Sequence, residues 1–597
     1  MNSKRFIIQL IAIVLSPAAL YPDRIDARRS IRQFEVTWVL LVLAVVWFSI
    51  CFRLGDLPLE QPDEGRNAEI AREMKESGAW LVPTYDGIAY LDKPAFYFKA
   101  VAISLAVFGD SETAARIPSA AFGIGVLALT YLFCRRIYGV RCAALAAIVL
   151  ATTPLFLVNA RTVIFDIALC LFTVAAIFAG FLAEESEGRS RRNWYLIGAA
   201  AAGFATLVKG PVGFLIPGLV LMIFHRIVGR RGVWKRFFSP LNLLVFFGVV
   251  LPWFIGLSLA HPDFPHYGLV EESFRRFTTT EFHRAKPVYF YAIIVMGMFL
   301  PWSLLLPESA LAAGKSRRSL SPADVFCVTW AVVVVIFFSL SKSKMPGYIL
   351  SATVPCAMLV ARLLATALAN SAGRAAKIVK HAAIGFAVLC MFGVAAVLFL
   401  STRTRLLAHP LGISVAEAGE FRPHIIVAAI LLGLFSLFAL LAGFKPWMKL
   451  CVACFILFPL LLLNVNYQML KVVFDAKSAR ALAGRIPSLP PRTELACLDC
   501  FPSGLSFYLG RQAVLITHDG GELTSNYILF RLKHENPWPK NLVHDSEVTQ
   551  WLAARKQPVF LIAREQDGSK LKALVADTGA NIQQLTPGYI GVLLPSP

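Results

Sequence analysis

The chain has 597 residues, of which 57% are hydrophobic and 16% are charged, and its formal charge is +21 at pH 7. Many apolar runs are about 20 residues long, enough to cross roughly 30 Å of hydrocarbon as a helix, which excludes an ordinary soluble protein. The basic residues are divided among short loops beside these runs, so the charge does not indicate a nucleic-acid surface. The composition predicts a polytopic α-helical membrane protein.

Thirteen apolar runs are expected to span the membrane, and they end near residue 466. The expected organisation is an N-terminal cytoplasmic or interfacial segment over 1–34, a transmembrane domain over 35–466 and a soluble α/β domain over 467–597. The runs cover residues 35–53, 113–134, 141–159, 163–183, 194–209, 211–228, 237–260, 287–307, 323–341, 345–365, 381–401, 424–443 and 447–466.

The orientation follows from lysines and arginines in the short loops, which favour the cytoplasm. With thirteen spans, almost all basic loops fall on one side, and Arg403 and Arg405 are the exceptions. We therefore expect the N-terminus inside, with the C-terminal domain and the long loops 54–112 and 261–287 outside. The basic loops include Arg135, Arg136 and Arg141, then Arg189, Arg191 and Arg192, then Arg230, Arg231 and Lys235.

Two apolar segments are too short to span. Phe6 to Leu20 follows Lys4 and Arg5 and is similar to the core of a signal peptide. If it spanned, every later loop would change sides, so we interpret it as a non-spanning or interfacial segment, or as an extension from an early start codon. Residues 96–108 are expected to form an interfacial helix in the first outer loop.

Two of the eleven cysteines lie in the expected outer domain. Cys497 and Cys500 form a Cys-Leu-Asp-Cys motif, and oxidising conditions there would permit a disulfide. A single CxxC motif is a weak signal for zinc. A tight disulfide and two free thiols remain the two interpretations.

The first outer loop contains a cluster of charged residues beginning with Asp63. Residues 64–77 have the pattern of an amphipathic helix, with Ile70 and Met74 one turn apart, charged residues elsewhere and Gly78 as a stop signal. Asp63 would then be the N-cap residue, and capping alone explains an Asp at this position. The alternative is a carboxylate held at the membrane surface and directed at a substrate.

Three further charged residues have both a structural and a functional interpretation. Lys93 precedes the expected interfacial helix, where it could anchor the helix or meet a lipid phosphate. Asp166 lies just inside an apolar run, a costly position that favours function, although pairing with Arg161 would also explain it. Lys209 begins a Lys-Gly-Pro turn and could reach the interface or bind an anion.

Two later outer loops add more such groups. The loop over 261–287 mixes aromatic, acidic and basic residues, a composition that suits a sugar and phosphate site and also an interfacial aromatic belt. The loop over 341–348 adds the cations Lys342 and Lys344. Because acids, cations and a histidine gather on one face, the sequence predicts chemistry there.

These motifs, in this order, resemble the polyprenyl-phosphate-sugar-dependent glycosyltransferases of the GT-C class. Within that class the sequence is most similar to the bacterial family that transfers 4-amino-4-deoxy-L-arabinose to lipid A, which is related to protein O-mannosyltransferases. The similarity covers about 35–470 and, less distinctly, the outer domain. The matching motifs are Asp63-Glu64, Asp-Lys-Pro at 92–94, Arg-Thr-Val-Ile-Phe-Asp at 161–166, Lys-Gly-Pro at 209–211, the loop from His266 to Arg284, and Lys-Met-Pro-Gly-Tyr at 344–348.

The resemblance implies an inverting transfer from undecaprenyl phosphate-aminoarabinose to a lipid A phosphate, at the periplasmic face of the bacterial inner membrane, with resistance to polymyxin as the result. It implies a monomer whose partners are the lipid-linked donor, lipid A and membrane lipids, without nucleic acid. The implied residues are Asp63 and Asp166 for catalysis, Lys93, Arg276, Tyr348 and Lys209 for the donor phosphate, and Glu64, Asp92, Glu272, His283 and Lys344 for substrate binding.

The chemistry is consistent with these residue types. A phosphate acceptor, with a second pKa of about 6, is already ionised near neutral pH and needs alignment and charge compensation more than a strong base. A hydroxyl acceptor would instead require Asp63 as a general base. No cofactor is required, although Asp63, Asp92 and His283 could supply ligands to a divalent metal.

Two alternative functions remain from the sequence. The same donor class could serve transfer to protein hydroxyls or to the lipopolysaccharide core. A flippase for a lipid-linked sugar is the non-enzyme alternative, and it would favour inverted repeats and ionisable residues near mid-membrane, which the sequence does not display.

Overall fold

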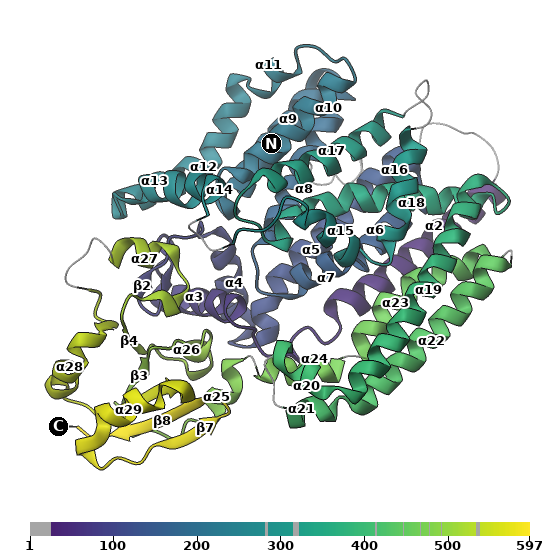
Figure 1. Cartoon of the computed structure of the whole chain (residues 1–597). Coiled ribbons are helices and arrows are strands. Elements are labelled where there is room, and N and C mark those ends of the chain that lie inside the picture. The colour runs from purple at the N-terminus through teal and green to yellow at the C-terminus, as the bar shows by residue number, and fades with distance from the viewer. Residues whose placement is uncertain are drawn as a thin grey trace.

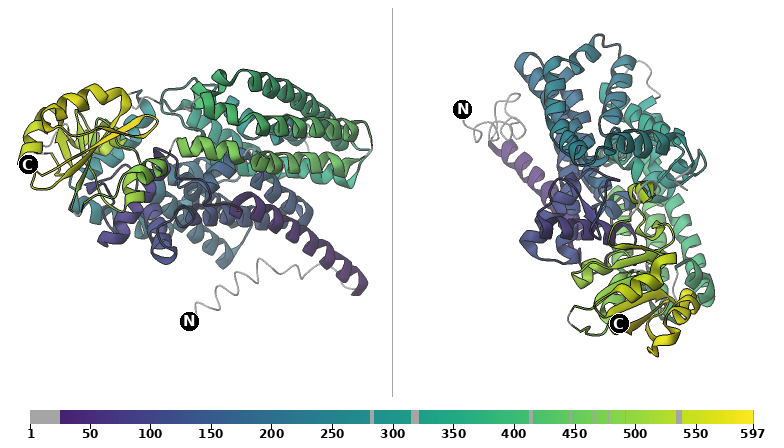
Figure 2. Two further views of the ribbon diagram at one scale, coloured as in Figure 1. Left: turned by 90° about the horizontal axis from the view of Figure 1, so that it is seen from below. Right: turned by 90° about the vertical axis from the view of Figure 1, so that its left-hand side faces the viewer.

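The computed structural model describes residues 25–280, 284–314, 321–411, 415–445, 447–465, 467–476, 478–490, 492–532 and 538–596. Long helices form most of the molecule, and a C-terminal domain of strands and short helices lies at one end of them (Figure 1). Figure 2 shows the N-terminal purple helix and the green helices extending away from the yellow C-terminal domain. The architecture is a polytopic helical membrane fold with a C-terminal α/β domain, as the sequence predicted.

Eight helical segments in the described part of the chain are long and apolar enough to cross a membrane. They are formed by α5 (Glu112–Tyr138), α8 (Asp166–Glu184), α12 (Pro240–Ala260), α17 (Pro322–Leu340), η4 (Pro346–Ala352) with α18 (Thr353–Ala369), α19 (Arg374–Thr402), α22 (Arg422–Phe444) with the end of α21 (Val415–Glu420), and α23 (Met448–Val465) with α24 (Tyr467–Ala476).

Two more apolar runs form bent helix pairs. α6 (Val140–Ala151) meets α7 (Pro154–Arg161) at 68°, and α15 (Phe290–Met298) meets the helical stretch that begins with η3 (Trp302–Leu305) and α16 (Leu306–Gly314) at 108°. The remaining three runs are helical but shorter or less apolar, so the total of thirteen spans stays a prediction. They are the stretch from Glu35 through α2 (Ile25–Val46) and η1 (Trp47–Cys51), α9 (Gly188–Lys209) and α10 (Val212–Ile227).

The first outer loop contains the two expected helices, α3 (Asp63–Ser77) and α4 (Phe96–Phe108). α3 ends at Gly78, whose φ of 66° suits a residue without a side chain. The expectation that Asp63 caps α3 is wrong, because the helix begins at Asp63 itself and Pro62 is the N-cap residue. The charged side of α3 is not exposed either. Arg66, Glu69 and Arg72 are buried, because the C-terminal domain and neighbouring loops cover them.

Short elements connect the main helices. They are β1 (Thr84–Tyr85), β2 (Ile88–Ala89), α11 (Val233–Phe237), α13 (Phe264–His266), η2 (Tyr267–Arg275), α14 (Arg276–Thr278), α20 (Thr404–Leu411) and α25 (Ala479–Arg485). β1 and β2 pair as a hairpin with Asp86 and Gly87 at its tip, and both have the positive φ that a tight hairpin turn requires.

The C-terminal domain is built on a six-stranded sheet with the order β5-β4-β3-β6-β8-β7. The strands β3 to β6 are parallel, and β8 runs antiparallel to both β6 and β7. The strands are β3 (Glu494–Leu498), β4 (Val514–Thr517), β5 (Leu542–His544), β6 (Val559–Arg564), β7 (Gln583–Thr586) and β8 (Tyr589–Leu594). The helices are α26 (Leu505–Leu509), η5 (Gly521–Leu523), α27 (Asn526–Leu532), η6 (Asp545–Glu547), α28 (Val548–Ala554), η7 (Glu565–Asp567), α29 (Gly568–Val575) and η8 (Ala576–Thr578).

The C-terminal domain packs directly on the first outer loop. A side chain added at Gly65 of α3 would place its Cβ 2.4 Å from the backbone oxygen of Ser503, so only glycine permits this approach. The hydroxyl of Tyr508 accepts a hydrogen bond from the backbone N–H of Leu59 at 2.8 Å. One hydrophobic cluster combines residues of both regions, including Met74. The two regions therefore share a core.

Cys497 and Cys500 lie in this shared region. Both side chains are fully buried, and both are free thiols in the structure. Of the two interpretations left by the sequence, the structure corresponds to free thiols.

Candidate functional site

A polar cavity of about 280 Å³ lies where the first outer loop, the helix ends and the C-terminal domain meet. It contains both acids that the sequence singled out and most of the predicted cations. The predicted site residues that line it are Asp63, Asp92, Lys93, Asp166, Lys209, Arg276 and Tyr348. These residues belong to six separate motifs of the sequence, and the fold brings them together.

Asp166 and Lys209 form one ion pair in the cavity wall. Asp166 is the first residue of α8 and Lys209 the last residue of α9, so each charge also suits the dipole of its own helix. The Nζ atom of Lys209 lies 4.2 Å from the ring centre of Tyr348. A Cβ at Gly347 would lie 3.1 Å from an Asp166 oxygen, so this glycine fixes how close η4 comes to the carboxylate.

Pairing between Asp166 and Arg161, the structural alternative considered from the sequence, does not occur. The Arg161 guanidinium donates instead to the backbone oxygens of Ser49 and Ile50, each at 2.9 Å. Asp166 therefore directs its carboxylate toward the cavity rather than toward its neighbour in sequence.

Asp63 also lines the cavity. Its carboxylate accepts a hydrogen bond from Arg66 Nη2 at 2.5 Å, and its side chain keeps 39% of its surface exposed. Arg66 Nη1 also donates to the Oγ1 atom of Thr524 at 2.7 Å and to its backbone oxygen at 3.2 Å. Of the two acids, Asp63 is therefore the one whose side chain is more exposed. Arg66 connects α3 to the C-terminal domain.

Lys93, Glu272 and Arg276 form a buried charge network. Both cations bond to the Glu272 carboxylate, and Arg276 also donates to the Tyr348 hydroxyl at 3.3 Å. Burial lowers the pKa of Lys93, although the attraction of Glu272 opposes this shift. Burial acts to raise the pKa of Glu272, but Lys93 and Arg276 hold it below its usual value. Because Lys93 and Arg276 share the single carboxylate of Glu272, the network has a net positive charge that can attract an anion.

Asp92 holds the C-terminal domain in place. Its carboxylate accepts hydrogen bonds from the Tyr267 hydroxyl at 2.7 Å and from the backbone N–H groups of Asn526 and Tyr527 at 3.0 and 2.7 Å. The Asn526 side chain donates to Glu272 at 3.1 Å. Because these donors already occupy Asp92, it is poorly suited to be a metal ligand together with Asp63.

Some predicted site residues lie elsewhere. The Glu64 carboxylate is buried and bonds to Arg116 at 2.7 and 2.9 Å, and it does not line the cavity. Lys344 is also buried and donates to the backbone oxygen of Ser341. Glu272 does not line the polar cavity, but it lines an adjoining groove and bonds there to Lys93 and Arg276. His283 lies outside the described residues.

Several cavity residues were missed by the sequence analysis. Arg66 and Asn67 follow Asp63 on α3, so a helix starting at Asp63 would have indicated at least Arg66. The Nε atom of Arg66 and the Oδ1 atom of Asn67 are buried without a hydrogen-bond partner among the described residues. Thr524 and Asn526 come from the C-terminal domain, and no local sequence signal identified them.

Two less polar cavities adjoin the polar one. A groove of about 380 Å³ shares Lys93, Lys209, Arg276 and Tyr348 with it and continues along apolar side chains of α10, η2 and α17. A pocket of about 400 Å³ adjoins the polar cavity at Leu155 and Met298.

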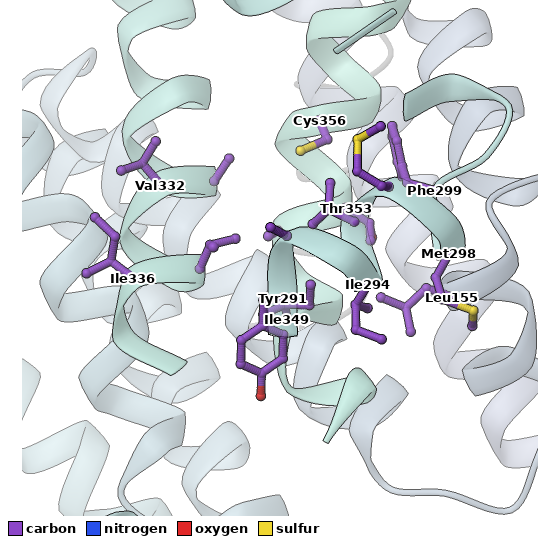
Figure 3. Close-up of a pocket in the computed structure, with 16 residues that line it drawn as sticks. Leu155, Tyr291, Ile294, Met298, Phe299, Val332, Ile336, Ile349, Thr353 and Cys356 are labelled. Atoms are coloured by element: carbon purple, nitrogen blue, oxygen red, sulfur yellow. The ribbon is translucent and has the colours of Figure 1, made fainter. Parts of the chain in front are cut away.

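Figure 3 shows this third cavity between two walls. Val332 and Ile336 of α17 lie on one side, and Ile294 and Met298 of α15 lie on the other. Its lining is almost entirely apolar. Two apolar spaces that converge on one charged cavity suit the hydrocarbon chains of two lipid substrates.

The chain is similar in sequence to several known proteins. The family model described as dolichyl-phosphate-mannose-protein mannosyltransferase matches residues 60–268. An undecaprenyl phosphate-α-4-amino-4-deoxy-L-arabinose arabinosyl transferase of Erwinia tasmaniensis is 32% identical over 419 residues, 68% of this chain and 73% of the relative. The corresponding protein of Shewanella sediminis is 29% identical, over 88% of this chain and 94% of the relative.

A solved structure is similar over nearly the whole chain. The crystal structure of ArnT from Cupriavidus metallidurans bound to undecaprenyl phosphate has a TM-score of 0.77 and 25% identity, and covers 94% of this chain and 98% of that one. The apo structure of the same protein has a TM-score of 0.76 with the same coverage.

Proposed function

Because this chain belongs to the undecaprenyl phosphate-α-4-amino-4-deoxy-L-arabinose arabinosyl transferase family, we propose that it moves 4-amino-4-deoxy-L-arabinose from undecaprenyl phosphate to a phosphate group of lipid A. The chain is a multi-pass membrane glycosyltransferase that uses a polyprenyl phosphate sugar donor. One observation supports placing the reaction in the polar cavity. Its lining combines two acids with four candidates for binding phosphate, and two apolar cavities adjoin it. The acids are Asp63 and Asp166, and the four candidates are Lys93, Lys209, Arg276 and Tyr348.

The donor phosphate lies, in this proposal, at the junction between the polar cavity and the groove along α10 and α17. Lys93, Arg276 and Lys209 are shared by both spaces and supply the positive charge. Contacts between these cations and phosphate oxygens are charge-assisted hydrogen bonds. The prenyl chain then follows the apolar side chains of the groove.

The sugar lies between Asp63 and Asp166, and the lipid A phosphate enters from the opposite side. An acceptor phosphate oxygen attacks the anomeric carbon, the bond from that carbon to the donor phosphate breaks, and undecaprenyl phosphate leaves with inversion. The cations compensate the charge that develops on the leaving phosphate. Asp63, the exposed acid, orients the incoming acceptor or the sugar ammonium. No step requires a metal, because lysine and arginine side chains supply the positive charge.

The acceptor's hydrocarbon chains occupy the apolar pocket at Leu155 and Met298 in this proposal. That pocket shares Leu155 and Met298 with the cavity, and the donor groove shares other residues with it, so the two lipids would occupy separate spaces. A membrane-embedded acceptor explains an apolar entrance better than a protein hydroxyl does.

We further propose that the cavity faces the periplasm and that the protein acts as a monomer in the inner membrane. The basic loops between helices, on the side expected to be cytoplasmic, support this orientation. The outcome for the bacterium would be a less negative lipid A and greater resistance to polymyxin.

The test uses purified full-length protein in lipid nanodiscs with donor carrying a labelled sugar. Lipid A, a lipopolysaccharide core and a serine- and threonine-containing peptide are offered separately. Mass spectrometry should find label on lipid A phosphate alone. Label on the peptide or on core sugars, with lipid A unmodified, would contradict the proposed acceptor while leaving the donor class intact.

A further inference from the structure

A cluster of side chains that could bind a metal ion lies in the C-terminal domain, outside the polar cavity. His518, His544 and Asp545 each offer one ligand atom, and these atoms lie within 4.8 Å of one another. The Nδ1 atom of His518 is 3.5 Å from one Asp545 oxygen, and the Nδ1 atom of His544 is 3.1 Å from the other. Two imidazoles and one carboxylate form a common ligand set for Zn²⁺ and related transition metals.

The backbone, rather than chance contact of surface side chains, brings these residues together. β4 and β5 are parallel neighbours in which Thr517 pairs with His544, so the residues that follow each strand emerge at the same edge of the sheet. The carboxyl edge of parallel strands is also where open α/β sheets usually bind ligands. The ring of Trp538 packs 5.2 Å from the ring of His544, and Ser546 Oγ lies 2.7 Å from its Nδ1 atom, so this ring is positioned from two sides.

The cluster is also connected to the catalytic cavity. His518 begins a segment, residues 518–526, that leaves β4 and reaches the cavity at Thr524 and Asn526. The far end of this segment is already fixed by Arg66, Asp92 and Glu272. At the near end, the Oγ1 atom of Thr517 donates to Glu522 at 2.7 Å and accepts from the backbone N–H of Gly520 at 3.0 Å. The side chain of His518 is 79% exposed and lies beside Asp545, which follows β5.

We propose that His518, His544 and Asp545 bind a divalent transition metal of the Zn²⁺ class, and that the metal ties the near end of segment 518–526 to β5. Zinc ligands lie about 2.0–2.2 Å from the ion, so donor atoms around it are at most about 4.4 Å apart. Small side-chain rotations bring the three donors into that range. Three protein ligands leave a fourth position for water, and the role assigned to the metal is structural.

The binding test uses full-length protein with an affinity tag that contains no histidine. The protein is stripped with a chelator and dialysed against Zn²⁺, and bound metal is measured by mass spectrometry. His518→Gln and Asp545→Asn should each weaken binding at one site about tenfold or more, since even outer partners of metal ligands contribute roughly 10- to 100-fold. Glu547→Gln removes the same charge two residues from Asp545 and should bind Zn²⁺ as the unaltered protein does.

Because only differences between variants are compared, zinc at the buried thiols or in the catalytic cavity does not affect the result. Unchanged binding in both His518→Gln and Asp545→Asn would overturn the site. An equal loss in Glu547→Gln would also overturn it, by indicating unspecific attraction of cations to acidic residues.

Hydrogen exchange tests whether the metal connects segment 518–526 to β5. Zn²⁺ should slow amide exchange within residues 518–526 of the unaltered protein and should leave the rate unchanged in His518→Gln. His518 is exposed, so this variant should fold, and equal melting temperatures without metal would verify that. If zinc binds but does not slow amide exchange in residues 518–526, the metal does not hold this segment to β5, and that part of the proposal is wrong. Neither measurement involves sugar transfer, so both are independent of the proposed function.

Discussion

Asp63 and Asp166 each lie beside one cation, yet their surroundings differ. Asp166 pairs with Lys209 near the ring of Tyr348. Asp63 pairs with Arg66 and remains partly exposed to the cavity. The more accessible carboxylate is therefore the better candidate for direct contact with a reacting group, whereas Asp166 holds Lys209 in the cavity wall.

Replacing Asp63 with asparagine should lower lipid A modification by roughly 10²–10³-fold, the usual effect of losing one electrostatic contact made in a transition state. The side chain keeps its size, so expression and melting temperature should change little. The product is measured by mass spectrometry of lipid A. Asp110→Asn is the matched control, because Asp110 pairs with Lys75 in the same loop at 2.6 Å and does not line the cavity. Near-normal transfer by Asp63→Asn would assign this acid a purely structural role.

Arg276→Ala should raise the donor concentration needed for half-maximal rate by roughly ten- to a hundredfold. Charge-assisted contacts to phosphate contribute about 1.5–3 kcal/mol, and each 1.4 kcal/mol is about tenfold. Glu272 keeps Lys93 and Asn526 as partners in this variant, so the fold should survive.

The adjacent Arg275 provides the control for that measurement. It pairs with Glu271 at 2.9 Å and lines neither the polar cavity nor the donor groove. Arg275→Ala should leave donor dependence unchanged. The same donor dependence in both variants would place the phosphate elsewhere, with Lys209 as the next residue to examine.

At the scale of elements, α3 and the C-terminal domain depend on each other. The helix carries Asp63 and Arg66 at its start, and Gly65 permits the backbone near Ser503 to approach. Glu69 and Arg72 on the same helix pair with each other in the interior at 2.6 Å. The position of Asp63, the proposed catalytic acid, therefore follows from the docking of a domain formed more than 400 residues later in the chain.

Gly65→Ala should destabilise this docking by about 1–3 kcal/mol, because the new Cβ would lie 2.4 Å from a backbone oxygen that cannot rotate away. The measurements are melting temperature and protease sensitivity of the C-terminal domain. Gly484→Ala in α25 is the control, since nothing lies within 4 Å of its added Cβ. Equal behaviour of the two variants would contradict a tight contact between α3 and residue 503.

For the whole molecule, the distribution of basic loops predicts two accessible sides. Cysteine introduced at Arg191 should react with an impermeant thiol reagent only from the cytoplasmic side, and cysteine at Lys556 in the C-terminal domain only from the other. Both are made in a background without the eleven native cysteines. Reaction of both from the same side would contradict the thirteen-span topology.

The helices were predictable because an apolar run is a local pattern, and helices cover most of each of the thirteen runs in the described part of the chain. The gathering of Asp63, Lys93 and Asp166 was predictable because alternating spans place alternate loops on one side. The burial of α3 was not, since charged residues at helical spacing normally indicate a solvated surface. Thr524 and Asn526 were not predictable either. Their partners Arg66 and Asp92 lie 458 and 434 residues away, and the contacts leave no periodic pattern in the sequence.

The contribution of Thr524 and Asn526 to the cavity has a consequence for biogenesis. Chains fold from the N-terminus as they are synthesised, so the membrane helices can insert before these two residues exist. A nascent chain at that stage holds every predicted catalytic acid and cation but lacks part of the cavity wall. Membrane insertion and completion of the cavity are then separate events, and we expect a chain that ends before Thr524 to insert without forming the whole cavity.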